Sequence, residues 1–369
     1  MTSHARGATR LVVEATREMT SIVEAMHVAI ASGPWMLGRP LELPVKLATR
    51  PVYGAIRAIT ALVGAGLDRL LAALALELPA STSRDAFVAA ANGVAGDYLE
   101  ASGNPLAIQM SLRTVVPASG PTGKVLVLVH GSSMSDHQWV RDGHDHGAAL
   151  ARDLGFTPVY VRYNSGRHIS TNGAELATQL ATLLAAWPVP VDDLVLLGHS
   201  MGGLVARSAL HAAASQAWRG QLRALVTLGT PHHGAPLERS GSWLQLLLGV
   251  HRYSAPLARL ARVRSAGVTD LRYGLVLDEH WQGRDRFAVS EDPRSPLELP
   301  ERMYVVAGAL SDRRPSDGIV PVASALGEHA TTALSFALPA AHRFTAAGVG
   351  HIDLLSSPAV YDQLRSWLA

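Results

Sequence analysis

The chain has 369 residues, of which 48% are hydrophobic and 17% are charged, and its formal net charge at pH 7 is only +2. This composition excludes an intrinsically disordered chain, a collagen-like fibre and a coiled coil, and the balanced charge argues against a nucleic-acid partner. The sequence contains no cysteine, which also excludes disulfides, thiolate metal sites and a cysteine nucleophile.

The first hundred residues predict helices that are distinct from the rest of the chain. Apolar residues recur at three- and four-residue steps over residues 11–31 and 52–78, which is typical of amphipathic helices, and a shorter helix is expected at about 85–95. We therefore predict an N-terminal helical extension over residues 1–104. The extension could cover the rest of the molecule, form a homodimer or lie on a membrane surface, and the sequence leaves these alternatives open.

The N-terminal segment predicts neither a signal peptide nor a transmembrane helix. Charged residues interrupt the apolar pattern from residue 14 onward, and the uncharged stretches at 25–38 and 58–67 are shorter than the ~20 residues that span a bilayer. We expect a cytoplasmic protein, with peripheral contact to a membrane left open.

Strand-like and helix-like segments alternate over residues 105–369. Continuous apolar strands separated by helices indicate an α/β fold whose mostly parallel sheet is covered on both faces. The expected strands are residues 124–129, 158–163, 194–197, 224–228, 303–306 and 343–347. The expected helices are residues 147–154, 173–187, 201–214 and 360–368. Between about 236 and 300 this alternation gives way to a longer insertion rich in leucine and arginine.

The sequence GHSMG at residues 198–202 lies between an expected strand and an expected helix. This G-x-S-x-G pattern is typical of a sharp turn that exposes a nucleophilic serine and directs the first amides of the helix at a developing negative charge. Ser200 is therefore the candidate nucleophile. The backbone amide of Met201 is a candidate for one side of an oxyanion hole.

A second oxyanion donor is expected after the strand at 124–129, which ends in His130 and Gly131. Enzymes with this type of turn take their second amide from such an early loop. Ser132 is the first candidate and Ser133 is the alternative.

The acid and the base are expected in two later loops. Asp317 lies in a tight turn after the strand at 303–306, and Asp312 is its competitor. His351 lies shortly before the last helix, where its two ring nitrogens could reach a serine and a carboxylate. His342 is the alternative base, but it precedes the last expected strand.

With these motifs in the order serine, aspartate and histidine, the chain resembles the α/β-hydrolase superfamily. Within it, the chain is similar to bacterial lipases and esterases that also resemble GPI inositol-deacylases. The matching segments are HG at 130–131, GHSMGG at 198–203, LGTPHHG at 228–234, DGIVP at 317–321 and GH at 350–351. The resemblance implies an α/β-hydrolase fold with a helical cap or lid at about 236–300. It does not extend to residues 1–104.

The expected activity is hydrolysis of carboxylic esters with an apolar acyl or alcohol part, through an acyl-enzyme and without a metal or an organic cofactor. An acyltransferase, a thioesterase or a polyester depolymerase would use the same triad. A non-catalytic lipid- or partner-binding module is the more distant alternative. Substrate-binding candidates around the serine are Ser133, His199, Asn164 and His168.

The polar segment from Asp136 to His146 is a further candidate, because it holds three histidines and three aspartates. These residues lack a defined metal-ligand spacing. We interpret the segment as a solvated loop.

Overall fold

The computed structural model describes residues 82–235, 265–286, 292–311 and 315–369. The helices expected at 11–31 and 52–78, the competitor Asp312 and much of the expected cap lie outside these ranges. The predictions of a homodimer, of membrane contact through the N-terminal helices and of a moving lid therefore stay predictions. None of the helices in the described ranges combines the length and the apolar character that crossing a bilayer requires.

The described residues belong to two compact units. Residues 82–98 and 108–369 form one unit, and residues 99–107 belong to the other. In the latter segment the Asn104 side chain accepts a hydrogen bond from the Leu106 amide at 2.9 Å. The sheet, the candidate site and the cavity described below lie in the unit that contains residues 108–369.

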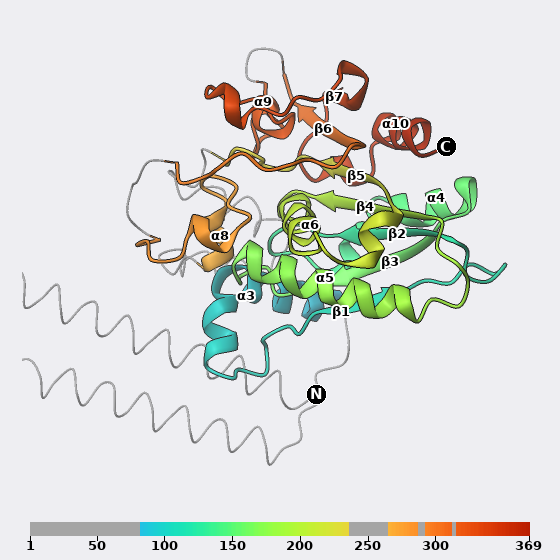
Figure 1. Ribbon diagram of the computed structural model, residues 1–369, viewed down its shortest axis with the longest axis horizontal. Helices are drawn as coiled ribbons and strands as arrows, with labels where there is room; N and C mark the ends of the chain where they lie inside the picture. Colours follow the sequence, from blue (N-terminus) through green and yellow to red (C-terminus); the bar gives the residue numbers. More distant parts are fainter. Residues whose placement is uncertain (1–81, 236–264, 287–291, 312–314) are drawn as a thin grey trace, which may run out of the picture. The chain divides into compact units, whose positions relative to one another are not determined.

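A seven-stranded, mostly parallel sheet forms the centre of this unit (Figure 1). The strands are β1 (Ser111–Thr114), β2 (Lys124–Val129), β3 (Thr157–Arg162), β4 (Asp193–His199), β5 (Leu222–Leu228), β6 (Met303–Ala309) and β7 (Arg343–Ala347). Their order is β1-β3-β2-β4-β5-β6-β7, and only β1 runs antiparallel to its neighbour. The predicted α/β-hydrolase fold class is confirmed.

Helices cover both faces of the sheet. The principal covering helices are α4 (His146–Leu154), α5 (Ile169–Ala185), α6 (Met201–Ala212) and α10 (Pro358–Leu368). Helices α4 and α10 pack against each other on one face, whereas α5 and α6 pack together on the other (Figure 1). Strand β2 is fully buried from Val125 to Val129, which explains why its residues are apolar at every position instead of every second one.

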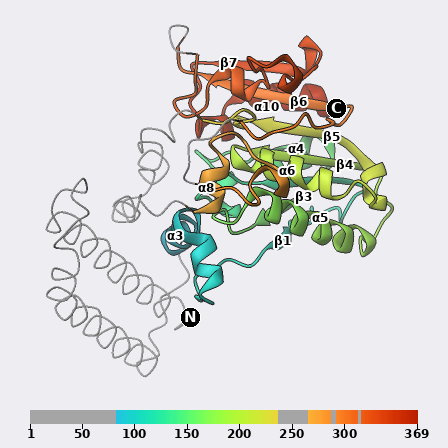
Figure 2. The ribbon, with the colours of Figure 1, turned by 60° about the vertical axis from the view of Figure 1, so that its left-hand side comes forward.

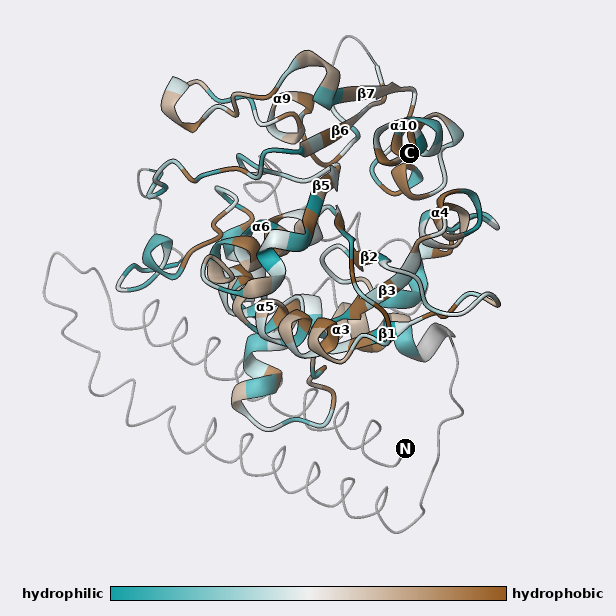
Figure 3. Cartoon of the chain, turned by 45° about the vertical axis from the view of Figure 1, so that its right-hand side comes forward, coloured by the Kyte–Doolittle hydropathy of each residue, from teal (hydrophilic) through white to brown (hydrophobic). Residues whose placement is uncertain are grey.

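The C-terminal helix α10 shows how the apolar pattern produces burial. Val360, Leu364 and Leu368 recur every four residues, so they share one side of the helix. All three are 0% exposed, and Figure 3 shows both hydrophobic and hydrophilic colours along α10. The expected helix at 360–368 is confirmed and begins two residues earlier.

Helix ends follow local capping chemistry. The Asp145 side chain accepts a hydrogen bond from the Ala148 amide at 3.1 Å and starts α4. Gly155, with φ 74°, ends the same helix in a left-handed conformation. The N-terminal helix of the described part, α3 (Thr82–Ala101), is longer than the expected helix at 85–95, and it is kinked at Ala95.

The loop segments that precede β6 place a further short helix beside α3. Helix α8 (Ala266–Asp270) lies next to α3 in both ribbon views (Figures 1 and 2). The Ala266 amide donates to Asp97 Oδ2 at 3.0 Å, and Ser265 Oγ donates to the Gly93 carbonyl at 2.7 Å. These contacts attach the described part of the expected cap region to α3.

Candidate active site

Ser200 occupies a strained turn between β4 and α6. Its φ is 54° and its ψ is −125°, a conformation that residues other than glycine rarely adopt. Its amide donates to the Leu228 carbonyl on neighbouring β5 at 2.8 Å. The turn therefore places the serine side chain at the carboxyl end of the sheet, where 6% of the residue is exposed.

The glycines of the motif allow this turn because no side chain fits at their positions. A Cβ atom built at Gly198 would lie 2.5 Å from Gly203 Cα, and one built at Gly202 would lie 2.1 Å from the Val129 carbonyl oxygen. Contacts this short force the backbone to move. The spacing of the motif therefore follows from the packing of α6 against β2 and β4.

We expect the substitution Gly202→Ala to lower the free energy of unfolding by about 3 kcal/mol, because the new methyl group meets backbone that cannot rotate away. Urea unfolding of the purified variant measures the change. Gly220→Ala is the matched control, since a Cβ atom there meets nothing within 4 Å. Equal stability of the two variants would contradict this account of the motif.

His351 and Asp317 form a buried pair. The imidazole Nδ1–H donates to Asp317 Oδ2 at 2.6 Å, and both residues are 3% exposed. The amides of Ile319 and Val320 donate to Asp317 Oδ1 at 2.9 and 2.7 Å. Burial raises the pKa of Asp317, but the charge of His351 and these hydrogen bonds outweigh it and hold that pKa below its ordinary value.

The end of β5 brings the serine close to this pair. A Cβ atom built at Gly229 would lie 3.0 Å from Asp317 Oδ2 and 3.1 Å from His351 Nδ1, while the preceding carbonyl, of Leu228, binds the Ser200 amide. His351 Nε2 is buried and has no hydrogen-bond partner among the described residues. The bond from Ser200 Oγ to this nitrogen is therefore not formed in this structure, which is common before substrate binds.

The conformation of the loop after β2 distinguishes between Ser132 and Ser133, the two candidates for the second oxyanion donor. Ser133 has φ 59°, and its amide donates to Ser165 Oγ at 3.0 Å. The Ser132 amide has no acceptor among the described residues. The Met201 amide lies in the first turn of α6, where a helix offers its amides no acceptor. The Ser132 and Met201 amides are thus both available as donors among the described residues.

His199 lies beneath the imidazole of His351. It is 0% exposed, its Nε2–H donates to the His351 carbonyl at 3.0 Å, and the two ring centres are 4.9 Å apart. Burial, followed by the charge of His351, lowers the pKa of His199 to about 3. His199 is therefore neutral near pH 7 and supports the backbone of His351.

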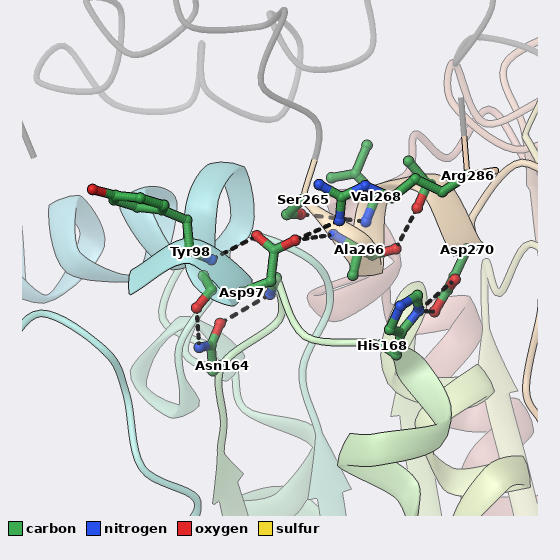
Figure 4. A network of polar contacts seen from close by, with 12 residues as sticks. Asp97, Tyr98, Asn164, His168, Ser265, Ala266, Val268, Asp270 and Arg286 are labelled. Carbon is green, nitrogen blue, oxygen red and sulfur yellow. Dashed lines mark hydrogen bonds and ion pairs between the residues drawn. The ribbon is translucent and has the colours of Figure 1, made fainter. Parts of the chain in front are cut away.

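Asn164 and His168 belong to a polar network around the loop after β3 (Figure 4). Asn164 Nδ2 donates to the Gly96 carbonyl of α3 at 2.9 Å, and its Oδ1 accepts from the Gly166 amide at 3.0 Å. The residue is 1% exposed. The contacts of Asn164 are therefore with the protein's own backbone.

His168 contacts α8, whereas Asn164 contacts α3. His168 Nδ1 lies 3.0 Å from Asp270 Oδ1, and its ring stacks on Trp281 with centres 3.6 Å apart. The Ile169 amide also donates to Asp270, at 2.8 Å. Figure 4 shows Asp270 and Asp97 as the two carboxylates of this network, and neither was a sequence candidate.

In the described ranges no three histidine, aspartate or glutamate side chains are arranged to hold a metal ion. The polar segment at 136–146 instead makes internal contacts. His144 Nε2 lies 2.9 Å from His146 Nδ1, and His146 Nε2 donates to the Leu354 carbonyl at 2.9 Å. His146 is 0% exposed. The interpretation of the whole segment as a solvated loop is therefore wrong for its end at His146.

The chain is similar in sequence to one protein family. Residues 120–294 match the model of the PGAP1-like alpha/beta domain. This stretch includes Ser132, Ser200 and Met201 and ends before Asp317 and His351. No curated protein matches the chain.

The chain is also similar to several solved structures. The mature lipase BlEst2 of Bacillus licheniformis has 18% identity and a TM-score of 0.47, over 70% of this chain and 98% of that chain. A lipase-esterase related protein from Clostridium acetobutylicum has 11% identity and a TM-score of 0.39, over 70% and 100% of the two chains. The type II thioesterase BorB from the borrelidin biosynthetic cluster has 19% identity and a TM-score of 0.39, over 70% and 95%.

Proposed function

We propose that this chain, whose described residues form a mostly parallel α/β sheet with the predicted fold, is a serine hydrolase that cleaves carboxylic esters with an apolar acyl or alcohol part. One observation carries the proposal. The buried hydrogen bond of 2.6 Å between His351 and Asp317 lies next to the strained turn that presents Ser200. Such an arrangement has a direct use in nucleophilic catalysis, because it supplies a base that is oriented by a carboxylate.

The proposed reaction passes through an acyl-enzyme. His351 Nε2 takes the proton of Ser200 while Oγ attacks the ester carbonyl carbon. The Ser132 and Met201 amides stabilise the negative charge on the tetrahedral oxygen. The ester bond then breaks, and the alcohol leaves with the proton from His351. Water, activated by the same imidazole, attacks the acyl-enzyme and releases the acid and the free serine.

Asp317 fixes the state of the base. Its Oδ2 accepts the Nδ1–H of His351, which leaves the lone pair on Nε2 for the serine proton. Its lowered pKa keeps it ionised at neutral pH, so it also stabilises the imidazolium that forms during the attack. We assign His199 a positioning role, because it holds the His351 carbonyl. Ser133, Asn164 and His168 stay candidates for shaping the substrate site.

Activity-based labelling tests the proposal. A fluorophosphonate probe should label the purified protein, and peptide mapping should place the label on Ser200. The same protein should hydrolyse p-nitrophenyl esters, and a series from short to long acyl chains should define its preference. The absence of both labelling and hydrolysis would overturn the proposal and favour a non-catalytic binding module.

Product analysis separates the related activities. An added alcohol as acceptor and an acyl thioester as donor can be offered to the same preparation. Free acid should be the main product from the oxygen ester. If acyl transfer to the alcohol exceeds release of acid, the protein is an acyltransferase, and a strong preference for the thioester would make it a thioesterase.

A further inference from the structure

A cavity of about 390 Å³ lies beside α6, apart from the proposed catalytic residues. Its walls come from α6, from the turn after β5, from residues 274–280 and 294–301, and from residues 333–339. Its lining includes none of Ser200, Asp317 and His351. The volume is within the range of small-molecule sites, and the inference below does not depend on the proposed function.

Arg207 brings a positive charge to this cavity, and no carboxylate among the described residues pairs with it. Its Nη1 donates to His232 Nδ1 at 3.4 Å, and its guanidinium carbon lies 4.7 Å from the centre of the Phe336 ring. No carboxylate of the described residues lies within 4.0 Å of it. Burial, followed by the charge of Arg294, lowers the pKa of Arg207 to about 9, so the group stays charged at neutral pH.

The second arginine of the cavity shows how such a charge is ordinarily balanced. Arg294 Nη2 donates to Asp292 Oδ2 at 2.6 Å, and Arg294 Nε donates to Asp292 Oδ1 at 2.9 Å. Its Nη1 donates to the His232 carbonyl at 2.7 Å and to His233 Nδ1 at 3.0 Å. Arg294 is therefore paired with a carboxylate, whereas Arg207 has only the hydrogen bond to His232 among the residues that the structure describes.

His280 adds an unused donor to the same lining. The Val276 amide donates to His280 Nδ1 at 3.4 Å, so this nitrogen carries the lone pair and Nε2 carries the hydrogen. The residue is 1% exposed, and its Nε2 has no hydrogen-bond partner within the described part of the chain. A buried donor without an acceptor costs free energy. The cavity thus holds two groups that an anion would satisfy.

We propose that this cavity binds a small organic monoanion with an apolar body, of the medium-chain carboxylate class. A carboxylate matches the planar fork of the Arg207 guanidinium and can accept a further hydrogen bond from His280. The exposed Glu301 also lines the cavity and disfavours ligands with more than one negative charge. The apolar body would contact the hydrophobic part of the lining, which is formed by Val276, Leu297, Leu299, Phe336 and Leu338.

Calorimetric titration and thermal unfolding with octanoate test the proposal on the full chain. Octanoate should bind and raise the unfolding temperature of the wild-type protein by about 5 °C at saturation. Arg207→Met keeps an unbranched apolar stem but removes the guanidinium and its charge, so it should lower the affinity at least about ten-fold. Arg365→Met, at an exposed position of α10, is the matched control and should bind like the wild type.

Titrations with other ligands, and with the Arg207→Met variant, can overturn the proposal. Octanol at the same concentrations should bind far more weakly, so equal binding would show that the charge is not recognised. Stabilisation by inorganic phosphate without stabilisation by octanoate would show that the ligand class is wrong. Octanoate binding that is unchanged in Arg207→Met would place the carboxylate elsewhere, for example beside Ser200.

The unliganded variants separate binding from folding. Arg207→Met should unfold at the same temperature as the wild type or higher, because it removes a half-buried charge that has no carboxylate partner among the described residues. Arg207→Lys should keep part of the octanoate affinity, since it keeps the charge and loses the fork. If Arg207→Met unfolds earlier and octanoate does not stabilise the wild type, Arg207 serves the fold and the proposal is wrong.

Discussion

Ser200→Ala is expected to reduce ester hydrolysis by at least about 10⁴-fold, because alanine has no oxygen that can form the acyl-enzyme. The side chain of Ser200 is not needed for the fold, since the backbone amide of this residue, and not its hydroxyl, donates to the Leu228 carbonyl. The variant should therefore remain folded. Steady-state rates with a p-nitrophenyl ester measure the loss, and fluorophosphonate labelling should disappear in parallel.

Ser215→Ala is the matched control for this substitution, because Ser215 is exposed and follows the C-terminal end of α6, whereas Ser200 precedes its N-terminal end. Its rate should equal that of the wild type. Adding His351→Ala to Ser200→Ala should cause little further loss, because the two residues act as one unit. Wild-type labelling of Ser200→Ala would show that another residue is the nucleophile.

The position of the candidate nucleophile could be predicted because it depends on local sterics. Gly198 and Gly202 stand two residues from Ser200 on either side, and both lie where a side chain would collide with backbone. This steric requirement for glycine involves only five consecutive residues, so it can be recognised in the sequence. The loops with Asp317 and His351 were predicted from their place in the strand order, and the structure brings these two residues together.

The support around the site could not be predicted, because its partners are distant in the chain. Ser165 receives the amide of Ser133 across 32 residues, and Asp270 binds His168 across 102 residues. No periodic pattern links such residues. The choice between Ser132 and Ser133 also depends on the positive φ of Ser133. A serine in the sequence does not indicate a positive φ.

The strands differed in how well the sequence indicated them. Strand β2 was predicted with its observed bounds, because a strand buried on both faces is apolar throughout. Strand β1 was not predicted, because it is short, lies at the sheet edge and alternates between exposed and half-buried residues. Buried strands could therefore be predicted, because burial requires apolar residues that are visible in the sequence.

Acid is expected to destabilise the protein strongly between pH 6.5 and about pH 4. Burial lowers the pKa values of His130 and His146 to about 4 and that of His199 to about 3. An unfolded chain takes up these protons near pH 6.5, so their contribution to stability is complete above that pH and is lost as the pH falls. All three shifts have the same direction, so the three losses of stability add as the pH falls.

Urea unfolding at a series of pH values between 8 and 4 measures this loss, and His146→Gln tests its cause. His146 lies away from the proposed catalytic residues, and a glutamine amide can donate to the Leu354 carbonyl as the imidazole does. The variant should lose less stability between pH 6.5 and about pH 4, by the equivalent of about one proton. His211→Gln, at an exposed position of α6, is the control. A pH dependence that is identical in His146→Gln and the wild type would show that acid unfolding has another origin.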